Sequence, residues 1–176
     1  MESNRIIFYP LGIQHLPDIS SFLANHEVRY RMKLPTLDTE AKRHDWFEAF
    51  QVARNSRTAF RWAGYLKSNK QYASLLTIKD IDHTNSRAEL GYSVNPALWG
   101  HGLASEAAGL GCDFAFNKLG IHTLIAKILP DNPASLRIIQ KLGFVQEAHF
   151  KESHFFEDDY HDLLQFYKIN PAHLAS

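Results

Sequence analysis

The sequence predicts a single domain over residues 1–176, of mixed α/β (α+β) class, with a central mixed sheet and helices on its faces. Two observations predict this class. Short segments with alternating apolar side chains are interleaved with segments whose apolar residues recur every three or four positions. Two pairs of extended segments are joined by short polar turns, one before the middle of the chain and one near its end, as in antiparallel hairpins. A hydrophobic content of 45% is normal for a globular domain of this length.

Composition excludes several function classes. The formal net charge is zero, so nothing in it favours nucleic acid or an acidic membrane surface as a partner. Cys112 is the only cysteine, so the chain has no internal disulfide, and we expect a small buried apolar residue there. No apolar run approaches the ~20 residues of a membrane span. The polar start, Met1 to Asn4, lacks a signal-peptide core, and we expect a cytoplasmic protein.

The first half of the chain begins with a strand that ends at Pro10, and Thr39 is the expected cap of its second helix. The segments expected there, in order, are a strand at Arg5–Tyr9, a helix at Gly12–Ala24, an irregular stretch at Asn25–Thr39 interrupted by Pro35, a helix at Thr39–Ala53, and a hairpin of Thr58–Leu66 with Gln71–Lys79, followed by a polar loop at Asp80–Ser86.

In the second half, Asn132 is the expected N-cap of a helix, with Pro133 at its first position and Gly143 just past its end. The segments expected around it are a strand at Ala88–Val94, a helix at Gly102–Asn117, a strand at Thr123–Leu129, and two closing strands at Phe144–Phe155 and Tyr160–Ile169 joined by the turn Glu157–Asp159.

The stretch Asn95 to Ala107 joins a strand to the first turn of a helix and contains Gly100 and Gly102. A helix start carries unpaired N–H groups and partial positive charge, and glycine lets an anion approach the backbone. These features indicate a site for a diphosphate-bearing cofactor, with an ordinary connecting loop as the alternative. The dinucleotide fingerprint is absent, because Ser105 stands where its third glycine would be.

Two blocks carry a resemblance to a known family. The stretch from Trp99 to Ala107 resembles the acyl-CoA-binding motif of the GNAT superfamily of N-acyltransferases, with Gly102 and Ala104 at its last two fixed places and Trp99 where glutamine or arginine is usual. The blocks Asn132–Ser135 and Lys141–Phe144 resemble the family's second motif. The pattern is most similar to the branch of ribosomal-protein N-terminal acetyltransferases.

The resemblance implies a GNAT fold, in which a largely antiparallel sheet splays apart at the cofactor site, and acetyl-CoA as co-substrate. A backbone N–H near Ser93 or Val94 would meet the carbonyl oxygen as negative charge develops on it. The residues that the resemblance assigns to cofactor binding are Ser93, Val94, Trp99, Gly100, His101, Gly102, Leu103, Ala104 and Asn132.

Two side chains are candidates for catalysis. Glu89 matches the glutamate that relatives use, directly or through water, as a general base; the alternative is a surface carboxylate paired with Arg87 or Lys127. Many relatives protonate the thiolate with a tyrosine where this chain has Ile139, so that role is not transferred. Ser135 is the substitute implied by the resemblance, and a helix-start serine that bonds locally is the alternative.

The acceptor side is expected at Asn25 to Ala53, where Arg29, Arg31 and Lys33 would meet an acidic acceptor or remain solvated charges on a loop. We expect no metal site. His154, Glu157, Asp158 and His161 follow no zinc-ligand spacing and indicate a solvated hairpin tip.

The resulting hypothesis is an acetyl-CoA-dependent N-acetyltransferase that acts on a primary amine, with a protein or peptide N-terminus as the favoured acceptor. Two alternatives are a small-molecule amine (an antibiotic, polyamine or amino-acid derivative) and a module that holds CoA without turnover. A peptide needs an open channel and a small amine a closed pocket, so the width of the groove beside Glu89 separates the acceptors. A homodimer is a possible assembly.

Overall fold

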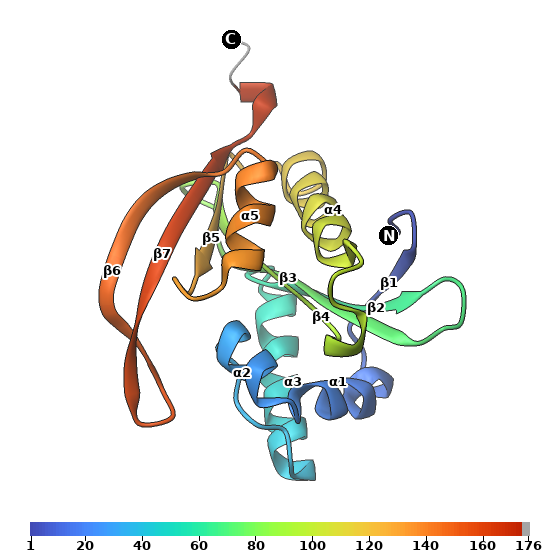
Figure 1. The fold of residues 1–176 in the computed structure, drawn as a ribbon. Helices are drawn as coiled ribbons and strands as arrows, with labels where there is room; N and C mark the ends of the chain where they lie inside the picture. Colours follow the sequence, from blue (N-terminus) through green and yellow to red (C-terminus); the bar gives the residue numbers. More distant parts are fainter. Residues whose placement is uncertain (174–176) are drawn as a thin grey trace.

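The computed structural model describes residues 1–173 and contains one sheet of seven strands in the order β1-β2-β3-β4-β5-β7-β6 (Figure 1). Only β4 and β5 pair in parallel; the other neighbours are antiparallel. The strands are β1 (Ile6–Pro10), β2 (Phe60–Leu66), β3 (Tyr72–Asp82), β4 (Arg87–Val94), β5 (Thr123–Ile128), β6 (Val145–Phe156) and β7 (Asp159–Ile169). The helices are α1 (Leu16–Leu23), α2 (His26–Met32), α3 (Glu40–Asn55), α4 (Leu103–Asn117) and α5 (Pro133–Lys141), with short 3₁₀ turns at Ile13–His15, Pro96–Leu98 and Pro171–His173.

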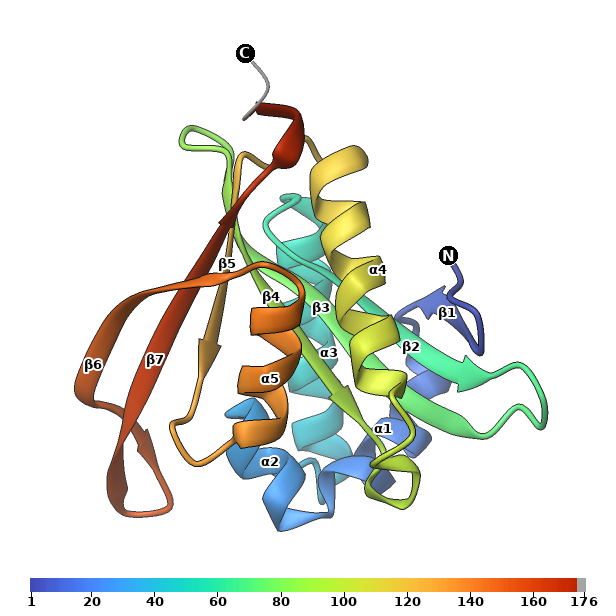
Figure 2. The same ribbon diagram turned by 45° about the horizontal axis from the view of Figure 1, so that its top comes forward.

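Helices cover both faces of the sheet. Helices α4 and α5 lie on one face, and α1, α2 and α3 lie on the other (Figure 2). Strand alternation divides the apolar residues accordingly: Leu76 and Leu90 belong to the core beneath α4, whereas Ala63 and Leu75 belong to the core beneath α1 and α3. Residues next to each other on one strand therefore face different cores.

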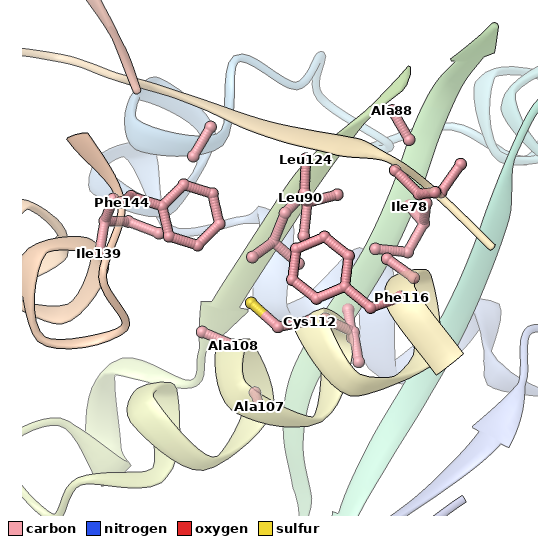
Figure 3. Packing of buried hydrophobic residues seen from close by; sticks show 14 of the residues in the cluster. Ile78, Ala88, Leu90, Ala107, Ala108, Cys112, Phe116, Leu124, Ile139 and Phe144 are labelled. Atoms are coloured by element: carbon pink, nitrogen blue, oxygen red, sulfur yellow. The ribbon is translucent and has the colours of Figure 1, made fainter. Parts of the chain in front are cut away.

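Helix α4 packs very close to the sheet. A Cβ on Gly111 would lie 2.6 Å from Leu90 Cδ1 and 2.9 Å from a Leu76 methyl group, so only glycine fits there. Cys112 is buried in the same core, among the side chains of Figure 3, which confirms its expected role as a small apolar residue. Helix α4 therefore lies directly on β3 and β4.

Strands β4 and β5 separate partway along their length. Their pairing ends at Glu89 with Ile125, although β4 continues to Val94 and β5 to Ile128. Beyond Glu89 the backbone of β4 has no strand partner on its β5 side. The splay that the resemblance implied is therefore present, and it opens a wedge in the middle of the sheet.

The acceptor-side prediction missed one helix. The stretch from Asn25 to Thr39 was expected to be irregular, but α2 occupies its first part, with the Asn25 carboxamide oxygen accepting a hydrogen bond from the Val28 N–H at 3.1 Å. The helix ends at Lys33, whose φ of 56° is left-handed. Pro35 lies beyond this end and did not exclude the helix.

Smaller differences concern element boundaries. The helix expected from Gly12 begins as a 3₁₀ turn and becomes α-helical only at Leu16, with Pro17 in its first turn, where a missing N–H costs nothing. Strand β3 runs through Asp80, with φ 52°, into the stretch expected to be a loop. Within residues 1–173 no helix is long and apolar enough to cross a membrane.

Candidate active site

The wedge between β4 and β5 opens into a cleft of about 910 Å³. Its walls come from the ends of β4 and β5, the loop before α4, the start of α5, and helix α2. Predicted site residues that line it are Glu89, Ser93, Val94, Trp99, Gly100, Gly102, Leu103, Ala104, Asn132 and Ser135. The structure thus brings both sequence blocks to one cavity.

The start of α4 can hold phosphate oxygens. Gly102 is its N-cap in a left-handed conformation (φ 78°), and no side chain of residues 1–173 caps the helix, so the first backbone N–H groups remain free to bind an anion. A Cβ on Gly100, with φ 80°, would have no atom within 4 Å, which leaves open space beside the backbone. Arg137 and Lys141, which the sequence analysis did not select, line the same cleft from α5. These residues fit the diphosphate of acetyl-CoA.

Trp99, the departure from the family motif, fixes the loop to the sheet. Its indole N–H donates a hydrogen bond of 2.7 Å to the carbonyl oxygen of Val94, the last residue of β4. This contact ties the glycine loop to the strand edge that borders the wedge. The hydrogen bond also occupies the carbonyl oxygen of Val94, a residue predicted to bind the cofactor.

The start of α5 lies across the wedge from β4. The Asn132 side chain caps α5 by accepting a hydrogen bond from the Ser135 N–H at 3.1 Å. The hydroxyl of Tyr92 lies 3.4 Å from the backbone oxygen of Ser135, to which it donates. Burial raises the pKa of Tyr92, so the phenol keeps its proton at neutral pH. The hydroxyl of Ser93 is buried in the described structure without a hydrogen-bond partner.

The structure does not bring His101 into this cleft. Its imidazole Nδ1 lies 3.3 Å from the Leu98 carbonyl oxygen, and its own carbonyl accepts a hydrogen bond from Arg5. His101 lines a separate hollow beside Arg5 and Lys67, so its expected position near the cofactor phosphates has no support in the geometry.

Glu89 is buried rather than at the surface. Only 3% of it is exposed, and its carboxylate lies 3.0 Å from Lys79 Nζ and 3.2 Å from Lys127 Nζ. Lys127 is close to Oε2 but not aligned for a hydrogen bond, so this oxygen has a charge partner and no donor. Arg87, the other partner considered, pairs instead with Glu147.

The lysines around Glu89 keep its carboxylate ionised. Burial alone would raise the pKa of Glu89, but the positive charges of Lys79, Lys33 and Lys127 outweigh burial and hold the pKa below its usual value. A carboxylate with a lowered pKa is a weak base but a strong hydrogen-bond acceptor. It can orient an amine and receive its proton only if the amine is itself made more acidic.

Lys33 reaches into the wedge from the end of α2. Its ammonium donates a hydrogen bond of 3.0 Å to the Lys127 carbonyl oxygen and, within residues 1–173, has no carboxylate within 4.0 Å. Burial, with Lys79 and Lys127 nearby, lowers the pKa of Lys33 to about 8, although Glu89 partly opposes this. The cluster of Lys33, Lys79 and Lys127 around Glu89 is hereafter the lysine cluster.

The other two predicted acceptor-side cations have structural partners. Arg29 donates to the carbonyls of Leu23 and Ala24 and lies 3.5 Å from Glu157. Arg31 pairs with Glu27, one turn earlier on α2. Of the three cations that the sequence analysis selected, Lys33 is the one left facing the cleft without a carboxylate.

The turn of the β6–β7 hairpin is exposed at Glu157 and Asp158, as expected, but the hairpin also contacts α2. Glu157, in its turn, pairs with His26 and Arg29 of α2. His154 lines the cleft, and its Nε2 is buried without a hydrogen-bond partner among the described residues. Burial and the charge of Lys33 lower the pKa of His154, so it is neutral at pH 7. Residues 1–173 contain no group of three metal-ligating side chains.

Comparisons with known proteins agree with this geometry. Residues 5–145 match the family model described as an acetyltransferase (GNAT) domain. The chain is 24% identical over 152 residues to the uncharacterized N-acetyltransferase YoaA of Bacillus subtilis, covering 86% of each chain. It is 29% identical over 103 residues to the spermidine N(1)-acetyltransferase of Escherichia coli K12, covering 58% of this chain and 55% of that protein.

The fold resembles a solved structure of Vibrio cholerae spermidine N-acetyltransferase in complex with CoA and spermine, with a TM-score of 0.85, 19% identity, and coverage of 97% of this chain and 98% of that one. Another structure of that enzyme is described as dodecameric. These relatives do not support the ribosomal-protein branch or a protein N-terminus as acceptor. The chain belongs to the GNAT acetyltransferase family and is an acetyl-CoA-dependent N-acetyltransferase.

Proposed function

We propose that this enzyme acetylates the amine of a small molecule. The observation that carries the proposal is the contact between α2 and the β6–β7 hairpin, two elements that each contribute residues to the cleft wall. A peptide substrate needs an open channel beside Glu89, and a hairpin held against α2, next to Val28 and His154 of the cleft wall, would narrow such a channel. The spermidine acetyltransferases among the relatives, whose named substrate is a small amine, support the same acceptor class.

The contact consists of several interactions between α2 and the hairpin. Glu157 pairs with His26 and Arg29, and the Tyr30 hydroxyl lies 3.3 Å from His161 Nδ1. The Tyr30 ring also packs against Phe156 at 5.7 Å between centroids. Ion pairs, a hydrogen bond and aromatic packing together hold the hairpin against α2. We call this set of contacts the clasp.

Acetyl-CoA, when bound, supplies an acetyl group as a thioester, and the acceptor must present an uncharged amine to it. The lysine cluster favours this form, because neighbouring positive charges lower the pKa of an ammonium ion. The carboxylate of Glu89, which lines the cleft, is the group to accept the hydrogen bond of the amine and then its proton, directly or through water.

Donors at the wedge can meet the two other groups whose charge changes in the reaction, the carbonyl oxygen and the departing thiolate. Beyond Glu89, β4 has unpaired backbone groups near Ser93 and Val94 that can donate to the developing oxyanion. The hydroxyls of Ser135 and Tyr92 lie at the opposite wall, where a proton can be given to the departing thiolate. The amine loses one proton, the thiolate gains one, and an amide and free CoA result.

The test is thiol release from acetyl-CoA with a panel of small amines and peptides of varied N-terminus. The proposal predicts turnover with at least one small amine and rates near background for peptides. Turnover of peptides with none of the small amines would overturn it, as would turnover of neither. A double substitution that opens the clasp, Glu157→Gln with Tyr30→Phe, should raise the KM for the amine and leave the KM for acetyl-CoA unchanged.

A further inference from the structure

A second cation, Arg61 of β2, lines the acceptor side of the cleft. Its guanidinium carbon lies 4.6 Å from the centroid of the Trp46 ring and 5.1 Å from that of the Phe50 ring, both on α3. Within residues 1–173 the guanidinium has no carboxylate within 4.0 Å and donates no hydrogen bond to a protein atom. Aromatic rings therefore hold the group in place while its donors remain unused.

The unused donors of Arg61 suit an anionic ligand. A guanidinium has five N–H donors in a planar fork that matches the oxygens of a carboxylate or a phosphate. Burial lowers the pKa of Arg61 to about 10, with Asp80 partly opposing it, so the group stays charged at neutral pH. Cation–π contact helps to hold the guanidinium, and its donors, which are not among the buried atoms without a partner, stay accessible to a ligand.

The charges that line the cleft are strongly unbalanced. Its only carboxylates among the described residues are Glu27 and Glu89, and both are already paired with cations. Against them stand seven basic side chains: Arg31, Lys33, Arg61, Lys79, Lys127, Arg137 and Lys141. A polycation entering this cleft would meet repulsion of several kcal/mol for each close pair of charges, about 4 kcal/mol at 4 Å near a protein surface.

Arg61 does not lie with the cofactor phosphates. It pairs in register with Thr77, which in turn pairs with Gly91, and this row faces α3. Leu90, the neighbour of Gly91, packs beneath α4 on the opposite face. The start of α4 is thus separated from Arg61 by the sheet. Glu89 lies two residues from Gly91 on the face of Arg61, and glycine leaves the space between them free of a side chain.

We propose that the acceptor is a small amine that also carries an anionic group, a carboxylate or a phosphate, which Arg61 binds while the amine lies at Glu89. Lys33, the buried ammonium without a carboxylate, adds to the attraction at the same end of the cleft. This inference rests on the proposed small-amine acetyltransferase activity and specifies its substrate class. It also separates this enzyme from its polyamine-acetylating relatives.

The test compares kcat/KM for pairs of acceptors that differ only in the anionic group. Suitable pairs are phenylalanine with phenethylamine, γ-aminobutyrate with butylamine, and phosphoethanolamine with ethanolamine; spermidine is the polycation. We expect the anionic member of at least one pair to be favoured about 10-fold or more, since a buried charge pair contributes to binding on this scale. The carboxylate and phosphate pairs show which anion is bound.

Variants assign the preference to Arg61. Arg61→Gln should abolish the difference within the favoured pair by raising the KM of the anionic member about 10-fold or more, with the KM for acetyl-CoA unchanged. Arg54→Gln is the matched control, because Arg54 is exposed on α3 and forms no ion pair within the described chain. Lys33→Met provides a second variant with the same expected direction if Arg61→Gln folds poorly.

The outcomes distinguish the two proposals. The anionic-acceptor inference is overturned if butylamine, phenethylamine or spermidine is acetylated at least as fast as every anionic acceptor. That result leaves the small-amine function intact. Turnover of peptides alone, or of no acceptor, removes the small-amine function and this inference with it. Preference for an anionic member that survives in both Arg61→Gln and Lys33→Met also overturns the inference, because the anion then binds elsewhere.

Discussion

The ammonium of Lys33 donates a 3.0 Å hydrogen bond to the carbonyl oxygen of Lys127, where β5 has already separated from β4. At this position the Lys127 carbonyl has no partner on β4, and the Lys33 ammonium at the end of α2 donates to it instead. The contact places a positive charge beside Glu89 without a carboxylate of its own. A group held in this way destabilises the fold when charged and attracts an anion into the cleft.

Lys33→Met should stabilise the enzyme at pH 7. The pKa of Lys33 is lowered to about 8 in the folded protein from 10.5, so burial of the charge costs up to about 3 kcal/mol below pH 8. Between pH 8 and 10.5 the unfolded chain binds the proton and the folded one does not, so the stability of the parent rises towards that of the variant. Urea unfolding at pH 7 and pH 10 measures the difference.

The control for this prediction is Lys70→Met, at an exposed lysine that forms no ion pair within residues 1–173. It should change the free energy of unfolding by less than about 0.5 kcal/mol at either pH. The ammonium would not be a buried charge if Lys33→Met were less stable than the parent at pH 7. The same would follow if the substitution changed the free energy of unfolding equally at pH 7 and pH 10.

Glu89→Gln should lower kcat by about 10²- to 10⁴-fold, the usual contribution of a positioned base. The loss should shrink as pH rises, because more of the acceptor is then already uncharged. Acetyl-CoA affinity should change little. The lysine cluster also loses its negative charge, so the variant should be less stable by about 3 kcal/mol, and rates must be measured well below its Tm.

Glu27→Gln tests whether any cleft carboxylate has this effect. Glu27 lines the same cavity but pairs with Arg31 on its own helix. We expect a change in kcat of less than about threefold, since exposed pairs contribute little. Parental kcat and an unchanged pH profile in Glu89→Gln would leave Glu89 with a structural role only.

Gly102→Glu should abolish the rise in Tm that acetyl-CoA produces by mass action. The substitution puts a negative side chain at the uncapped start of α4, where a φ of 78° already disfavours any residue except glycine. Gly120→Glu is the control, because Gly120 has a φ of 66° with open space around it and does not line the cleft. Equal stabilisation of both variants by acetyl-CoA would refute the phosphate site.

Glu157→Gln should raise the KM for the acceptor severalfold by removing the ion pairs that join the hairpin to α2. The KM for acetyl-CoA should stay constant, since the opposite end of the cleft is untouched. Asp158→Asn, in the same turn and with the same left-handed backbone, is the control and should behave like the parent. An unchanged acceptor KM in Glu157→Gln would mean that the clasp does not bound the acceptor pocket.

Much of the fold could be predicted from local patterns. Asn132 with Pro133 marked the start of α5, and the spacing of apolar residues located α4. Helix α2 was missed because seven residues give too little periodicity, although Asn25 followed by Glu27 is an acceptable helix start. Boundaries such as that of β3 depend on strand pairing, which is not a local property.

The candidate site was only partly accessible to sequence reasoning. The glycine loop and Glu89 could be found because their neighbours in the chain form a motif. The lysine cluster could not, since Lys33, Lys79 and Lys127 come from three separate elements and meet only through sheet register and the end of α2. A lysine inside an otherwise apolar strand, as at Lys127, is the one signal that pointed towards it.

The same limit applies to charge. A formal net charge of zero suggested no preference for an acidic partner, yet the cleft collects seven basic side chains and two acidic ones. The acids that balance the total lie elsewhere, as with Asp38 and Asp162, which pair with lysines at the surface. Composition averages over the surface, and a binding site is a local excess.

A crystal structure with CoA and the best acceptor from the panel would show whether the wedge receives both substrates and whether Glu89 receives the amine. Diphosphate oxygens should lie on the backbone N–H groups that follow Gly102, and the acceptor nitrogen should lie within about 3.2 Å of a Glu89 carboxylate oxygen, a normal hydrogen-bond distance. An acceptor nitrogen bound away from Glu89, with CoA in the wedge, would contradict this role of Glu89.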